Sequence, residues 1–81
     1  MLRYLILPDL DLGDQPIVLS LWLVARGQRV QAGESVAEVL AGPVAVDLPA
    51  TVDGVLVEKL VAEGERITAG QQLAIISASP P

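Results

Sequence analysis

The sequence predicts an all-β domain, a flattened barrel or sandwich of two four-stranded antiparallel sheets with pseudo-twofold symmetry. Three observations lead to this prediction: the composition, an internal repeat, and regularly spaced glycines between short apolar runs. The composition is 52% hydrophobic but only 2% aromatic, so the core must be built from aliphatic residues, which suit a pleated sheet. A chain of 81 residues makes one domain, and it buries about 60% of the surface that its unfolded form exposes.

The internal repeat has a period of 37 residues. A shift of that length places residues 24–41 on residues 61–78, and eight of those 18 positions are identical. The identical pairs are Val24/Val61, Ala25/Ala62, Gly27/Gly64, Arg29/Arg66, Ala32/Ala69, Gly33/Gly70, Ala37/Ala74 and Ala41/Ala78. Two copies are too few for a solenoid, so they predict two interlocked halves. The middle of the chain then forms a hairpin tip at one end, and the terminal strands lie together at the opposite end.

The individual elements follow from the apolar runs and the turn formers between them. Strands are expected at residues 4–7, 17–24, 35–40, 45–48, 55–60 and 73–77. Residues 9–16 are rich in turn formers and make a loop. Two stretches bracketed by glycines six residues apart each indicate a turn, a very short strand and a second turn. Those glycines are Gly27, Gly33, Gly64 and Gly70.

The central stretch, residues 39–47, carries the turn signal Gly42-Pro43 near its middle. The turn is expected at residues 41–44. Proline is disfavoured at the third position of a type I turn, because it forces the preceding residue out of the helical region. We therefore expect a turn other than an ordinary type I turn, with Pro43 either at the second turn position or preceded by a cis peptide bond.

The charge and the missing residue types exclude several classes of function. A net charge of −5 disfavours binding to nucleic acid and to anionic membranes. The chain has no Cys and no His, which removes disulfides, thiolate chemistry, the commonest general base and the commonest neutral metal ligand. We therefore expect no catalytic residues and no metal site, and a cytoplasmic protein that is not an enzyme. No apolar run approaches the length of a membrane-spanning helix.

Taken together, these patterns resemble the lipoyl/biotinyl attachment domain family, the swinging-arm modules of 2-oxo acid dehydrogenase complexes and biotin-dependent carboxylases. The match covers residues 4–78 and is closer to lipoyl than to biotinyl domains, because the Met-flanked signature of the biotinyl domains is missing. The matching residues are Pro8, Leu10, Trp22, Leu23, Val24, Gly27, Val30, Gly33, Ala37, Glu38, Val39, Val46, Asp47, Pro49, Val52, Gly54, Leu60, Val61, Glu63, Gly64, Glu65, Gly70, Leu73 and Ala74.

The resemblance implies a lysine at the tip of the central hairpin, to which lipoate or biotin is joined through an amide. Counting back 11 residues from Gly54 puts this attachment position at Pro43, and counts from Pro49 and Asp47 give the same register. The hairpin tip is Ala41, Gly42, Pro43 and Val44, and it contains no lysine. Proline has no primary amine, so no cofactor is expected there. The sole lysine, Lys59, lies 16 residues further on.

Other candidate sites favour structural interpretations. Trp22 is expected to pack at the edge of the core. Asp9, Asp11 and Asp14 are expected in a solvated loop, because their spacing is not that of a calcium loop. Arg29 and Arg66 occupy equivalent repeat positions and are expected to form surface ion pairs with Glu34 and Glu65, each worth under about 1 kcal/mol. The four repeat glycines lack the order of a phosphate-binding loop, so they are expected only in turns.

Two functional hypotheses remain. In the first, residues 1–78 form a lipoyl-like domain without its cofactor, which acts as a non-catalytic interaction or assembly module. In the second, the chain is a diverged carrier domain of an acyltransferase from a 2-oxo acid dehydrogenase complex, with residues 79–81 as a disordered tail or the start of a linker. The uncharged runs around Leu21 and Pro43 indicate either simple packing or contact with a partner. That partner would be a component of a multienzyme complex or a second copy of the chain.

Overall fold

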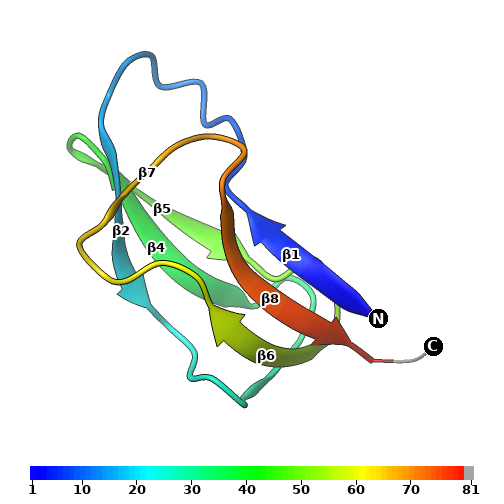
Figure 1. The fold of residues 1–81 in the computed structure, drawn as a ribbon. Helices are drawn as coiled ribbons and strands as arrows, with labels where there is room; N and C mark the ends of the chain where they lie inside the picture. Colours follow the sequence, from blue (N-terminus) through cyan, green and yellow to red (C-terminus); the bar gives the residue numbers. More distant parts are fainter. Residues whose placement is uncertain (80–81) are drawn as a thin grey trace.

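The computed structural model describes residues 1–79 and contains eight strands in two four-stranded sheets, with no helix in that range (Figure 1). The strands are β1 (Leu2–Ile6), β2 (Ile17–Trp22), β3 (Arg29–Val30), β4 (Ser35–Ala41), β5 (Val44–Pro49), β6 (Gly54–Lys59), β7 (Arg66–Ile67) and β8 (Gln72–Ala78). All neighbouring strands pair antiparallel. The predicted all-β sandwich is confirmed.

The two halves of the chain exchange strands. Sheet A has the order β1-β8-β6-β3, and sheet B has the order β5-β4-β2-β7. The short strand of each half therefore pairs with the long strand of the other: β3 with β6, and β7 with β2. The hairpin between β4 and β5 lies at one end of the molecule, while β1 begins and β8 ends at the other (Figure 1). Interlocked halves and adjacent terminal strands were both predicted from the repeat.

The core is aliphatic, and it is buried to the same depth in both halves. Leu19 and Leu56 are fully buried at equivalent repeat positions, as are Ala37 and Ala74. The core residues are Leu5, Leu7, Leu19, Val24, Val30, Val36, Ala37, Val39, Leu48, Ala50, Leu56, Val61, Ile67, Leu73, Ala74 and Ile76. Trp22 is half-buried and packs against this cluster, as expected. Neither half could enclose these side chains alone, because each sheet holds strands from both.

Some strand ends differ from the predictions. The second strand was expected to reach residue 24 but ends at Trp22, although the Leu23 N–H still donates to the Val36 carbonyl of β4 at 2.8 Å. The first strand starts two residues earlier than expected, at Leu2. Ser79, placed in a tail, donates its backbone N–H to the Asp53 carbonyl at 2.8 Å. Residues 80 and 81 lie outside the described residues, so the prediction of a tail or linker there stays a prediction.

The expected ion pairs of Arg29 and Arg66 are wrong. The Glu34 carboxylate accepts the backbone N–H of Gln31 at 3.0 Å, and the Glu65 carboxylate accepts that of Ala62 at 3.1 Å. Both acids thus close their own glycine turns, a local contact that competes with a longer-range ion pair. Across the described part of the chain, the one salt bridge joins Arg26 to Glu58 at 3.9 Å.

Candidate functional site

The hairpin tip projects from the end of sheet B. Strands β4 and β5 pair in register up to Ala41 and Val44, so the turn between them has two central residues, Gly42 and Pro43. Ala41 is fully buried, whereas Gly42, Pro43 and Val44 are exposed. The tip is therefore anchored by one small core residue and presents an uncharged surface to solvent.

The backbone of this turn differs from both alternatives expected for Pro43. Pro43 occupies the third turn position, and no peptide bond within residues 1–79 is cis. The expectation that the turn is not type I is confirmed, because Gly42 has φ +59° at the second position. Glycine tolerates this positive φ, so it leaves the helical region as proline requires without moving the turn. Positive φ at the first central residue alone is typical of the type II′ turns that favour hairpins.

The loop at residues 8–16 contacts the tip and has no counterpart of similar length in the second half. Leu7 and Ala50 are structurally equivalent, because their carbonyls accept the N–H groups of the repeat-related Gly70 and Gly33. After Leu7 the chain runs through this loop to reach β2, whereas after Ala50 only residues 51–53 precede β6. The Gly42 N–H donates to the Pro16 carbonyl at 3.4 Å. A Cβ on Gly42 would collide with the side-chain amide of Gln15. The loop thus packs on the backbone face of the tip.

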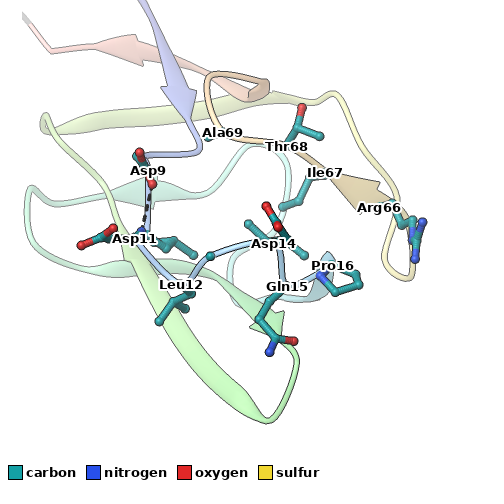
Figure 2. A pocket seen from close by; sticks show the side chains of 13 residues that line it. Asp9, Asp11, Leu12, Asp14, Gln15, Pro16, Arg66, Ile67, Thr68 and Ala69 are labelled. Carbon is teal, nitrogen blue, oxygen red and sulfur yellow. Dashed lines mark hydrogen bonds between the residues drawn. The ribbon is translucent and has the colours of Figure 1, made fainter.

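A hollow of about 360 Å³ lies between this loop and the segment around β7 (Figure 2). Asp9 accepts the Asp11 N–H at 2.9 Å, and this contact holds Asp11 at φ 54°. In Figure 2 the Arg66 side chain points away from the loop. No group of three potential ligand residues suited to a metal ion occurs within residues 1–79. The loop acids therefore line the hollow without being arranged as a coordination site.

The sole lysine is held at the other end of β2. The Lys59 ammonium lies 5.5 Å from the centre of the Trp22 ring, a cation–π geometry. The Trp22 indole N–H donates to the Val61 carbonyl at 3.0 Å, which fixes the ring. The tip neighbours Ile17 at the start of β2, and five residues of strand from there to Trp22 span roughly 17 Å. The 37-residue shift places Lys59 and Trp22 at equivalent positions of the two halves.

The residues of the tip do not fit a cofactor attached through an amide. Such a link needs a primary amine on a flexible stem, and the tip offers a proline ring and a glycine. Lys59 has the amine, but it lies within a strand and against an indole ring. The assignment of the family's attachment position to Pro43 rests on the residue count and stays a prediction. No helix of residues 1–79 is long and apolar enough to cross a membrane.

Comparison with known proteins supports the family assignment. A family model described as "Biotin-requiring enzyme", the biotin/lipoyl family, matches residues 8–78. A comparison with curated proteins finds no match. The matched range covers the core apart from Leu5 and Leu7, both glycine-bracketed repeats and the hairpin tip. On the strength of that match and of the two interlocked sheets, the chain belongs to the lipoyl/biotinyl attachment domain family.

Proposed function

We propose that this chain is a lipoyl/biotinyl-type domain that carries no cofactor and acts as a non-catalytic interaction or assembly module. The chemistry of the tip carries this proposal: Gly42 and Pro43 stand at the centre of the hairpin, and neither has an amine that could be acylated. Members of this family are carrier domains rather than catalysts. A carrier scaffold without an attachment residue retains the ability to present a shaped surface.

The geometry around the tip adds support. Gln15 packs against Gly42, and the Gly42 N–H donates to the Pro16 carbonyl, so Gln15 and Pro16 join the hairpin tip in one uncharged patch. Two exposed residues, Pro43 and Val44, extend that surface. Nothing in this arrangement requires a flexible arm. A protein partner, within a multienzyme complex or outside one, is the ligand that such a surface suits.

Intact mass after co-expression with a lipoate ligase and a biotin ligase tests this proposal. We expect the mass of the wild-type chain to equal that of the unmodified sequence. A gain of one lipoyl or biotinyl group would overturn the proposal and favour the alternative, a diverged carrier domain of a 2-oxo acid dehydrogenase complex. In that case the variant Lys59→Arg would lose the added mass, since Lys59 is the sole lysine.

A matched pair of tip variants controls for the scaffold. The double variant Gly42→Asp with Pro43→Lys restores the family's pattern, and we expect it to be modified if the ligases still recognise this fold. The control, Gly42→Asp with Pro43→Arg, has a similar charge but no acylatable amine, so its mass should stay unchanged. Failure of the lysine variant would mean that the surface has diverged beyond the tip, and it would leave the wild-type result intact.

A further inference from the structure

The outer face of sheet B carries side chains that are not needed for the packing of the core. Strands β2, β4 and β5 place six side chains there in two adjacent rows. The first row is Val18, Leu40 and Ala45, and the second is Leu21, Glu38 and Asp47. Arg66 of β7 pairs with Val18 and borders the first row at its outer edge. Leu40, Ala45 and Leu21 are exposed, and no strand or loop within residues 1–79 covers the face. We call these six residues the sheet B face.

The equivalent positions on sheet A provide an internal reference. The 37-residue repeat places Ser77 where sheet B has Leu40, and Ile75 where sheet B has Glu38. Tyr4 of β1 pairs with Ile75 as Asp47 of β5 pairs with Glu38. Because the same backbone accepts serine in place of Leu40, and apolar residues in place of both acids, the side chains of the sheet B face are not dictated by the fold.

The pairing of Glu38 with Asp47 is unfavourable for the isolated domain. The two carboxylates occupy directly opposite positions on neighbouring antiparallel strands, where like charges are destabilising. Neither takes part in the one salt bridge found within residues 1–79, which joins Arg26 to Glu58 on sheet A. The Ser35 hydroxyl lies 3.4 Å from Asp47 and provides one neutral contact. A cation brought by a partner would relieve this repulsion.

The charged residues of the domain are unevenly distributed between the two sheets, with most carboxylates on the sheet B side and most cations on sheet A. Sheet B, the turn before β7 and the tip loop together carry seven carboxylates and one guanidinium. They are Asp9, Asp11, Asp14, Glu38, Asp47, Glu63, Glu65 and Arg66. Sheet A with its turns carries four of the five cations, and three of these make contacts within the domain. Arg26 donates to the Val57 carbonyl, Arg29 donates to the Ser79 hydroxyl at 3.4 Å, and Lys59 lies on Trp22. Two copies of this acidic chain would therefore repel each other across the sheet B face.

We propose that the sheet B face binds a basic protein segment, which lays an aliphatic side chain on Val18, Leu40 and Ala45 and directs a Lys or Arg toward Glu38 and Asp47. An apolar centre beside charged groups is the usual anatomy of a protein interface. The contact is three strands wide, about 10 Å, so it suits a short segment better than a broad domain surface. This inference rests on the proposed function, because it names the kind of partner that the module would bind.

Three synthetic peptides test the proposal by titration into the full isotope-labelled chain, followed through backbone amide chemical shifts. The first peptide has two central leucines flanked by three lysines on each side. The second replaces the leucines with serines, and the third replaces the lysines with glutamates. We expect the first to shift the amides of the sheet B face, the second to bind at least about fivefold more weakly, and the third to leave the spectrum unchanged.

Charge variants separate a binding role from a structural one. The double variant Glu38→Gln with Asp47→Asn should bind the first peptide at least about tenfold more weakly while its urea midpoint rises, because the repulsion is gone. The control Glu58→Gln removes a carboxylate from sheet A and should leave peptide affinity unchanged. Shifts centred on Tyr4 and Ile75, equal binding of the serine peptide, or unchanged affinity of the double variant would each overturn the proposal.

Sedimentation of the chain alone addresses the other occupant, a second copy. We expect a monomer at concentrations up to several hundred micromolar, and a dimer abolished by Leu40→Ser would overturn the proposal of a basic partner. The result is independent of the mass measurement: a lipoylated or biotinylated chain that still bound the basic peptide would refute the cofactor-free function but leave the sheet B face as a docking site.

Discussion

The two halves of the domain are alike inside and different outside. Leu19 and Leu56 are both fully buried, and Val24 and Val61 are buried to 5% and 6%. On the outer faces, by contrast, Leu40 stands where the other half has Ser77. The contrast teaches that the repeat preserves what packing needs, while exposed positions are free to acquire separate properties. The positions where the halves diverge are therefore the ones that bear on function.

The connections between strands differ in the same way. The Leu7 carbonyl accepts the Gly70 N–H at 2.8 Å, and the equivalent Ala50 carbonyl accepts the Gly33 N–H at 2.9 Å. Beyond these matched contacts one half makes a short link, in which Asp53 accepts the Ala32 N–H at 2.7 Å. The other half makes the long loop at residues 8–16 that reaches the tip. The two halves thus differ most at the loop of residues 8–16 and the hairpin tip that it contacts.

The largest effect is expected when the shared interior is disrupted at equivalent positions. Leu19→Ala and Leu56→Ala each remove a fully buried side chain, and each should lower the free energy of unfolding by about 3 kcal/mol, within a usual range of about 2–5 kcal/mol. Urea denaturation followed by circular dichroism measures both. Similar losses and a single transition are expected, because strands of both halves share each sheet. Two separate transitions would contradict the interlocked core.

A smaller effect is expected at Gly54, where the repeat pairs a glycine with Ile17. A Cβ at Gly54 would collide with the backbone carbonyl of Ser77, and backbone on a neighbouring strand cannot move aside as a side chain can. Gly54→Ala should therefore cost about 1–3 kcal/mol of unfolding free energy. The control Thr51→Ala changes an exposed residue nearby and should alter stability by less than about 0.5 kcal/mol. Equal stability of the two variants would refute the close approach of β6 and β8.

The tip glycine allows two causes of strain to be separated. Gly42→Ala combines a positive φ of +59° with a collision against the flexible Gln15 side chain, and should cost about 1–2 kcal/mol. Adding Gln15→Ala removes the collision but not the backbone strain. If φ dominates, the double variant stays destabilised relative to Gln15→Ala alone by nearly the same amount. Full recovery in denaturation experiments would instead mean that the side-chain collision sets the cost.

Much of the fold followed from the sequence, because the 37-residue repeat and the aliphatic composition constrain how two halves can share a core. The conformation of the tip did not. Reasoning from Pro43 alone led to a second-position or cis proline, whereas the freedom of Gly42 allowed a third, trans solution. The cross-strand contact between two like charges was not predicted either. The repulsive pair Glu38 and Asp47 follows directly from a two-residue turn, so it became visible only when the turn was known.

The smallest expected effect concerns the pair that differs most between the halves, Trp22 and Lys59. Their repeat positions are equivalent, yet one supplies a ring and the other a cation that lies on it at 5.5 Å. A double-mutant cycle of Trp22→Leu and Lys59→Met should give a coupling of about 0.5–1 kcal/mol in urea denaturation. Lys59→Arg keeps a cation able to stack on the ring and serves as the control, with little loss.

This coupling also bears on the expectation that the sole lysine does not take the place of a tip amine. A measurable coupling means that the ammonium spends most of its time on the indole, roughly 17 Å of strand from the hairpin, and must leave a favourable contact to react. A coupling of zero would contradict that picture, and the amine would then be a mobile surface group open to acylating enzymes. In that event we expect the wild-type chain, but not the Lys59→Met variant, to gain the mass of a lipoyl or biotinyl group after exposure to the ligases. The double-mutant cycle therefore tests by stability, and the mass measurement by chemical modification, whether the Lys59 ammonium is held on the Trp22 ring.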